Sequence, residues 1–182
     1  MPRLPEVLDR NALPEDKREI HDYLAKTRGA VRLPFSAFLN NPELTYRIAH
    51  VGSYIRFDGS LPDKTRELAI LASAREMDAR FEWAGHARLA KELGISDSTI
   101  DAIASRKAPA GLTEEEALPV RAAQQLLREH KVDDATFNAA REQFGDAGVV
   151  ELLGTIGYYS LMACVLNGLE IEPPPEAPQL PR

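Results

Sequence analysis

The sequence contains a single cysteine, Cys164, among 182 residues. One thiol excludes a disulfide within the chain and any redox centre that needs two thiols of the same chain. Long apolar runs are also missing. The apolar stretch near the C-terminal end, Leu152 to Leu166, is shorter than the roughly 20 residues that a membrane-spanning helix needs. Residues 1–10 carry four charges and no apolar stretch of signal-peptide length. We therefore expect a cytoplasmic protein with no membrane partner.

The chain has fewer positive than negative residues: 22 Lys and Arg against 28 Asp and Glu, which gives a net charge of −6. A surface with this balance repels phosphate groups, so we expect no nucleic acid as a partner. Apolar residues make up 44% of the chain and charged residues 27%, which is typical of globular proteins. A chain of this length can form one domain with a sizeable core.

Strand patterns are missing as well, because no segment alternates apolar and polar residues between hairpin turns. Apolar residues recur at helical spacing instead. The sequence therefore predicts an all-α fold, a single-domain helical bundle of about seven or eight helices over residues 15–169. Residues 1–14 and 170–182 contain three and five prolines, and we predict an extended N-terminal arm and an extended C-terminal tail.

Capping signals predict where the helices begin. Asn41 before Pro42 predicts one start, and its helix has an apolar stripe that Gly59 ends. The stripe consists of Leu44, Ile48, Val51 and Ile55. A helix over 15–28 precedes this one, and later helices are expected to begin at Ser60, Phe81, Ser96, Thr113, Asp133 and Asp146. Pro119 is expected to kink or delay the helix that Thr113 and Glu116 cap.

Apolar residues surround the last predicted helix rather than lining one face. They are Val149, Leu152, Leu153, Ile156, Leu161, Met162, Val165 and Leu166. A helix that is apolar on most sides is buried on most sides. In a chain of this size it is either a central helix or a helix covered by another subunit, and we expect a homo-oligomer.

One carboxylate lies on an apolar helix face. Glu67 shares its face with Ile70, Leu71 and Ala74, at spacings of three, four and seven residues. A carboxylate buried on such a face loses its hydration and needs a partner. The arginines Arg47, Arg66 and Arg75 are candidates, and so is a group on the next helix.

The next helix carries two such groups. Glu82 and His86 are four residues apart, so they lie on one face, and Leu89 and Leu93 continue that face. Two inward carboxylates and one inward imidazole suit proton transfer. Glu82 and His86 also have the spacing of two metal ligands, but a zinc site needs three or four. The other histidines show no convergence on this pair, and we expect no metal.

Three segments carry a resemblance to a known family. Residues 61–71, 82–86 and 90–96 resemble the carboxymuconolactone decarboxylase family, which has the all-helical alkylhydroperoxidase-D-like fold. The resemblance is strong over residues 42–104 and weaker over 145–167. It implies an enzyme that works without a metal or an organic cofactor, and an assembly of three or six subunits. In the decarboxylase branch, proton transfers move a double bond as carbon dioxide leaves a carboxylated lactone.

The peroxidase branch of this family has a glutamate, about eleven residues, and then Cys-x-x-Cys-x-x-x-His. On this sequence the glutamate is Glu67 and the histidine is His86, whereas Ala79 and Glu82 occupy the two cysteine positions. The resemblance therefore predicts Glu67 and His86 as catalytic residues that carry protons, with Glu82 orienting or assisting His86. The substrate is expected to be a small carboxylated or lactone-type molecule.

Two alternatives stay open at this point. A thiol peroxidase would need the missing cysteines, since the thiolate is the group that reacts. A non-catalytic binding or assembly protein would keep the fold and lose the chemistry. Tyr158 and Tyr159, in the last helix, are candidates either for lining a pocket or for packing in an interface.

Overall fold

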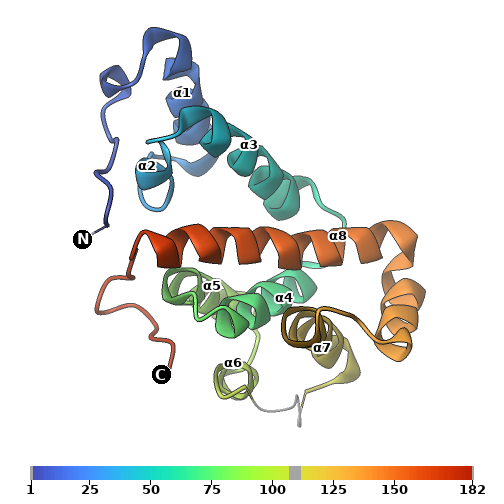
Figure 1. The fold of residues 1–182 in the computed structure, drawn as a ribbon. Coiled ribbons are helices and arrows are strands. Elements are labelled where there is room, and N and C mark those ends of the chain that lie inside the picture. The colour runs from blue at the N-terminus through green and yellow to red at the C-terminus, as the bar shows by residue number, and fades with distance from the viewer. Residues whose placement is uncertain (1, 107–111, 182) are drawn as a thin grey trace. The chain divides into compact units, whose positions relative to one another are not determined.

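The computed structural model describes residues 2–106 and 112–181, and within these ranges every regular element is a helix. The all-α prediction is confirmed (Figure 1). The described residues form the α-helices α1 (Arg18–Arg28), α2 (Phe35–Phe38), α3 (Pro42–Ser53), α4 (Asp63–Glu76), α5 (Arg80–Glu92), α6 (Asp97–Ala104), α7 (Glu114–Glu129) and α8 (Asp134–Gly168). The shorter elements are the 3-10 helices η1 (Arg10–Ala12) and η2 (Glu15–Lys17) and the π-helix η3 (Tyr54–Asp58).

The contacts within the chain divide it into two compact units, which the sequence did not predict. Unit 1 comprises Met1–Gly59 and Leu166–Glu172, and unit 2 comprises Ser60–Val165 and Pro173–Arg182. The division predicted from the sequence, into 1–14, 15–169 and 170–182, differs from these units and stays a prediction. Each unit is described by itself below.

Unit 1 is built around α1 and α3. The predicted start of α3 is confirmed, because the Asn41 side chain accepts a hydrogen bond from the Leu44 N–H and Pro42 is the first helical residue. The prediction that one apolar stripe of α3 is buried is confirmed for Ile48 and Ile55. It is wrong for Leu44 and Val51, which are each 50% exposed. The buried face centres on the small residues Thr45, Ala49 and Gly52, so it is rotated away from the line through the two exposed side chains.

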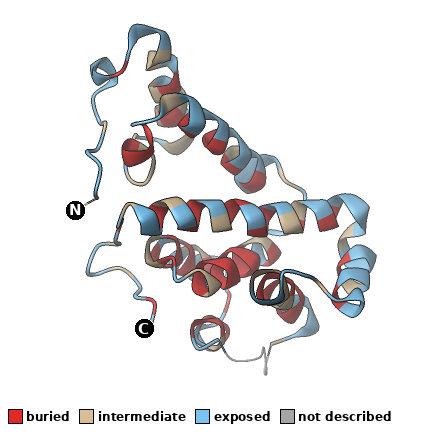
Figure 2. Ribbon diagram, viewed as in Figure 1, coloured by how far each residue is buried: buried red, intermediate tan, exposed pale blue. Residues whose placement is uncertain are grey.

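Unit 2 is built around α4, whose residues from Glu67 to Arg75 are all buried (Figure 2). Helices α5, α6 and α7 pack directly against it. The core also contains residues of α8, among them Val149, Leu152, Ile156 and Ala163. The sequence left open whether the last helix is central or covered by another subunit, and in unit 2 the most completely buried helix is α4. A helix enclosed on every side can bury a carboxylate such as Glu67 only if a neighbouring helix supplies its partner.

Helix α7 begins with the predicted capping box, in which Thr113 and Glu116 exchange side-chain hydrogen bonds with each other's backbone N–H. Pro119 does not delay this helix, which was expected to be delayed or kinked there. The proline is the sixth helical residue and is buried. Because proline has no N–H, it removes one backbone hydrogen bond close to the start of the helix, and the helix continues through it. The sequence also predicts a loop over residues 105–112, from Pro109 and Gly111, and most of it lies outside the described residues.

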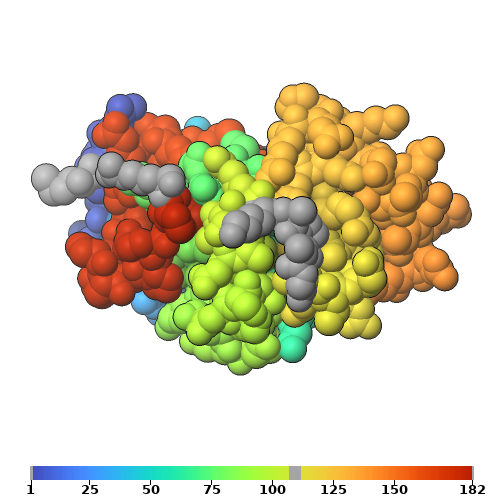
Figure 3. Space-filling view, turned by 90° about the horizontal axis from the view of Figure 1, so that it is seen from below, coloured from blue at the N-terminus to red at the C-terminus, as the bar shows by residue number. Residues whose placement is uncertain are grey.

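Helix α8 changes direction at Gly145, directly before the helix start expected at Asp146, and the backbone there has φ 68° and ψ 176°. A positive φ favours glycine because it has no Cβ. By length and composition α8 is apolar enough to cross a membrane, but more than half of its most apolar stretch is buried inside the protein, as in a core helix. Its exposed apolar residues include Val150 and Leu161, which are 71% and 42% exposed. The tail from Pro173 onward belongs to unit 2, and Leu180 is buried in the core of that unit. Figure 3 shows part of this tail, in dark red, on the face of the molecule that it presents.

Candidate active site

The three predicted site residues come from two consecutive helices of unit 2. Glu67 lies in the second turn of α4, and Glu82 and His86 lie one turn apart on α5. All three are buried, with exposed fractions of 3% for Glu67, 8% for Glu82 and 6% for His86. Because α4 and α5 pack against each other, their facing sides bring the three side chains together.

The imidazole of His86 lies between the two carboxylates. Its Nδ1 donates a hydrogen bond of 2.6 Å to Oε2 of Glu67. Its Nε2 lies 3.3 Å from Oε2 of Glu82, an ion-pair distance that is longer than a strong charge-assisted hydrogen bond. We call Glu67, His86 and Glu82 the carboxylate–imidazole triad.

Charge in the triad favours the protonated imidazole. Burial by itself lowers the pKa of His86, but the carboxylates of Glu67 and Glu82 outweigh burial and raise the pKa to about 9. At neutral pH both ring nitrogens therefore carry a proton, and each proton faces a carboxylate. The triad holds an imidazolium flanked by two acceptors, so it can deliver a proton or receive one through a carboxylate.

Arg66 extends the row of charges. Its Nε lies 3.8 Å from Oε1 of Glu67, beyond hydrogen-bonding distance, and this Nε is buried without a hydrogen-bond partner. Its Nη2 pairs with Asp63 at 2.8 Å. Of the three candidate arginines, Arg66 is therefore the one beside Glu67, while Arg47 pairs with Glu43.

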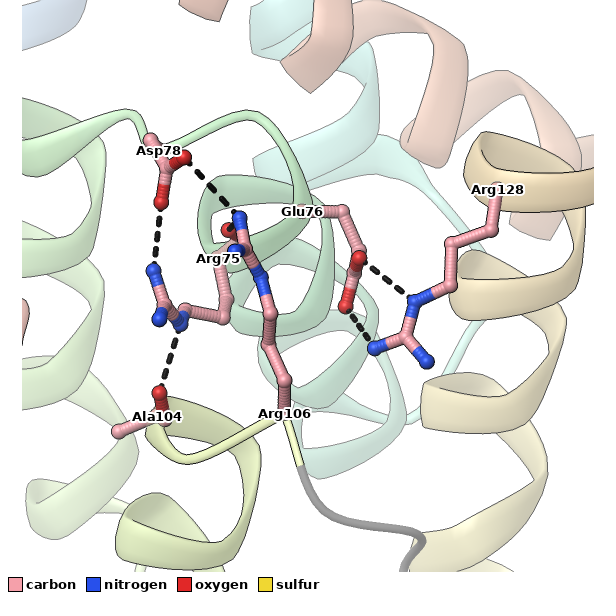
Figure 4. Close-up of polar contacts among 6 residues, drawn as sticks. All are labelled: Arg75, Glu76, Asp78, Ala104, Arg106 and Arg128. Carbon is pink, nitrogen blue, oxygen red and sulfur yellow. Dashed lines mark hydrogen bonds and ion pairs between the residues drawn. The ribbon is translucent and has the colours of Figure 1, made fainter. Parts of the chain in front are cut away.

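The third candidate arginine, Arg75, stabilises the turn between α4 and α5 (Figure 4). It donates to the carbonyl oxygen of Ala104 at 2.6 Å and to Asp78 at 2.5 Å. Arg106 donates to the backbone oxygen of Arg75 and pairs with the same Asp78. Beside this cluster, Arg128 forms two hydrogen bonds with Glu76, the last residue of α4. These contacts hold the end of α4 and thereby the start of α5, which carries Glu82.

Tyr159 of α8 is a neighbour of the triad whose role sequence reasoning did not resolve. Its ring packs edge-on against His86, with 4.9 Å between the ring centroids and an angle of 87° between the planes. Tyr158 packs on Tyr159 in turn. The only sequence signal was an aromatic pair in an apolar helix, which does not say which histidine it contacts.

Metal-binding geometry does not appear in the described part of the chain: no group of three or more His, Cys, Asp or Glu side chains there could hold a metal ion. Two of the histidines outside the triad have other contacts. His50 stacks on Tyr23 with 4.2 Å between ring centroids, and a ring nitrogen of His21 lies 3.0 Å from the carbonyl oxygen of Leu8.

The triad residues lie within a segment that matches a known family. Residues 42–125 match the profile of the carboxymuconolactone decarboxylase family. This segment is similar to that family. It contains all of α3, α4, α5 and α6, and therefore every residue of the triad. A comparison with curated proteins found no match.

Solved structures with the same fold come from three bacteria. The alkylhydroperoxidase AhpD core of an uncharacterized peroxidase-related protein from Ralstonia eutropha JMP134 has a TM-score of 0.78 at 20% identity, covering 96% of this chain and 93% of that one. An uncharacterized peroxidase-related protein from Silicibacter sp. TM1040 has a TM-score of 0.73 at 16% identity, covering 96% and 95%. A protein of unknown function from Agrobacterium tumefaciens, described as a putative antioxidant defence protein AhpD, has a TM-score of 0.68 at 20% identity, covering 76% and 97%. At these identities the likeness shows the fold alone.

Proposed function

We propose that this protein is an enzyme of the carboxymuconolactone decarboxylase type that transfers protons on a small carboxylated or lactone-type substrate. One observation carries the proposal: a buried imidazole lies between two carboxylates, 2.6 Å from Glu67 and 3.3 Å from Glu82. Such an arrangement can take a proton from one position of a substrate and return it at another without a thiol. The match of residues 42–125 to this family supports the choice of substrate class.

Each triad residue has a role in this scheme. Glu67 anchors the imidazole from the enclosed side, where Arg66 neighbours it. His86 supplies the positive charge that stabilises a carboxylate or an enolate next to it. Tyr159 limits the rotation of the ring by packing against its face or edge. Glu82 is the second carboxylate beside His86, so a proton can pass between the imidazole and either carboxylate.

Proton exchange between a probe and solvent tests the proposal. α-Angelica lactone has acidic hydrogens next to its carbonyl group, and their replacement by deuterium in deuterium oxide is followed by NMR. The protein is expected to accelerate this exchange and the shift of the ring double bond. His86→Gln is expected to lose about a hundredfold in rate, in the range that general acid–base groups contribute. Glu92→Gln, on the exposed side of α5, is the matched control.

A thiol peroxidase is the alternative that the names of the similar structures favour. In this chain Ala79 and Glu82 stand where the two cysteines of that chemistry would be, and Cys164 is the only thiol. Thiol-dependent consumption of a hydroperoxide by the purified protein would favour the peroxidase. We expect none above a Cys164→Ser control.

A non-catalytic protein on the same fold is the other alternative. It would be favoured if the protein did not exchange protons with α-angelica lactone and if no small lactone or carboxylic acid raised its melting temperature. A true ligand stabilises the folded state by mass action. We expect at least one compound of this class to raise the melting temperature of the wild type.

We also propose a homo-oligomer assembled through α8. Exposed residues on this helix recur at alternating spacings of four and three, all of them apolar or small: Val150, Gly154, Gly157, Leu161 and Cys164. An added Cβ at Gly154 or Gly157 would meet no atom within 4 Å, so the fold of one chain does not require these glycines for space. This spacing is that of a helix seam that another helix covers.

A further inference from the structure

The two carboxylates of the triad are held unequally. Glu67 accepts a hydrogen bond of 2.6 Å from His86, and its other oxygen lies 3.8 Å from Nε of Arg66. Glu82 has one polar contact among the described residues, the 3.3 Å ion pair between its Oε2 and His86. A carboxylate has acceptor positions on both oxygens, so Glu82 keeps acceptor capacity that its surroundings do not use.

The rest of the triad has less open capacity. Oε1 of Glu67 also accepts no hydrogen bond, but it lies beside the cationic Nε of Arg66 at 3.8 Å, whereas Glu82 has no second cation beside it among the ion pairs of the described residues. Both nitrogens of His86 face carboxylates, and Tyr159 packs against the ring. Glu67 is the least exposed of the three residues, at 3%, whereas Glu82 is the most exposed, at 8%. In the described part of the chain, the oxygens of Glu82 are not among the enclosed side-chain atoms that lack a hydrogen-bond partner, so water or a ligand can complete the contacts of this carboxylate. The incomplete end of the triad is therefore Glu82.

We propose that Glu82 is the residue through which the triad contacts its substrate and exchanges the proton with it. This inference rests on the proposed proton-transfer function and reverses the roles expected from the sequence, where Glu82 only assists His86. In this scheme Glu82 is the catalytic residue, and His86 and Glu67 are positioning residues. His86 orients the Glu82 carboxylate through Oε2 and leaves Oε1 for the substrate.

The proposal also defines the substrate. The group presented to Glu82 is an activated C–H next to a carbonyl, or an O–H, because a carboxylate accepts protons and hydrogen bonds. A carboxylate on the substrate has to point away from Glu82, since two negative charges in contact repel. The expected class is a small carbonyl compound, a lactone or a keto acid, whose acidic hydrogen is separate from its anionic group.

The step balances without an oxidant or a co-reactant. The C–H bond of the substrate breaks and its electron pair stays on the substrate as an enolate. The proton forms an O–H bond with Oε1 of Glu82, while His86 stays protonated beside the neutralised carboxyl group. Return of the same proton to a different carbon restores the Glu82 carboxylate and moves the double bond.

Chemical rescue by sodium formate tests this inference, because formate can replace a missing carboxylate only where a ligand can enter. Glu82→Ala is expected to lower the exchange rate of α-angelica lactone about a hundredfold. Formate is expected to raise the rate of this variant at least tenfold. Sodium chloride at equal ionic strength should restore nothing. Glu67→Ala, at the enclosed end, should not respond to formate, and Glu92→Ala should keep the wild-type rate. Glu82→Gln, which fills the space, should lose exchange without responding to formate.

A second readout does not depend on turnover. Formate should raise the melting temperature of Glu82→Ala above that of the same variant in sodium chloride, and should not do so for Glu67→Ala. If formate restores neither exchange nor melting temperature in Glu82→Ala, or if Glu82→Gln keeps its exchange rate within twofold, Glu82 does not contact the substrate. If the wild type itself does not exchange, the proposed function fails, while the melting temperatures still decide whether a ligand reaches the position of Glu82.

Discussion

Nδ1 of His86 lies 2.6 Å from Oε2 of Glu67, although 19 residues and a turn separate the two along the chain. The contact joins the second turn of α4 to the adjacent helix α5 inside the core of unit 2. A short hydrogen bond between two charged groups in such a place has consequences for stability, for titration and for chemistry, and each can be measured.

Stability should depend on pH through His86. Its pKa is raised from the unfolded value of 6.5 to about 9, so the protonated ring stabilises the folded state fully below pH 6.5. That contribution is lost as pH rises through 9, and the shift corresponds to about 3 kcal/mol at most. Urea unfolding at a series of pH values measures it. His86→Gln should remove the decrease between pH 6.5 and 9.5, and an unchanged decrease in this variant would contradict the assignment.

The two carboxylates should differ in their contribution to stability. Glu67→Gln removes the nearer counter-charge of a buried imidazolium and is expected to lower the free energy of unfolding by about 3 kcal/mol at pH 7. Glu82→Gln removes the longer contact and is expected to cost about 1 kcal/mol. The free energies of unfolding of both variants, measured with denaturant, are compared with that of the surface control Glu92→Gln. Equal losses at Glu67 and Glu82 would contradict the unequal geometry.

Introduced thiols should bring peroxide chemistry to this site. The double variant Ala79→Cys, Glu82→Cys places two cysteines three residues apart, with the second one turn before His86. A neighbouring imidazolium favours the reactive thiolate. We expect hydroperoxide consumption with dithiothreitol to rise at least tenfold above that of Ala79→Ser, Glu82→Ser. A double cysteine variant no more active than the serine control would show that the turn does not bring the positions close enough.

The exposed face of α8 should control assembly. Leu161→Glu places a charge in the middle of the apolar seam, where burial against a second helix would leave it unpaired. Sedimentation velocity is expected to show a shift from an oligomer toward the mass of one chain. Gln143→Glu, an exposed change on α8 before Gly145, is the control. A wild type that sediments as a single chain would remove the proposed homo-oligomer.

Much of this fold could be predicted because its signals are local. The Asn41 cap, the Thr113 capping box and the Gly145 break each depend on a few neighbouring residues, and each is present in the structure. The meeting of the triad followed from helical spacing, since the faces of α4 and α5 that carry Glu67 and His86 are both apolar.

What could not be predicted depends on packing between distant segments. The apolar stripe of α3 was read from spacing alone, but Leu44 and Val51 are exposed because the buried face follows the small residues beside them. The central position of α4, the contact of Tyr159 with His86 and the division into two units depend on which helices meet. Local periodicity does not encode that choice.

The most direct test of the account is a ¹⁵N NMR titration of the His86 ring, assigned by comparison with His86→Gln. We predict that both ring nitrogens carry a proton at pH 7.5 and that the ring titrates with a midpoint near 9. We also predict that the midpoint falls in both Glu67→Gln and Glu82→Gln, and falls further in Glu67→Gln. A ring that is neutral at pH 7.5, or a midpoint that neither variant changes, would contradict the carboxylate–imidazole triad and the proton transfer built on it.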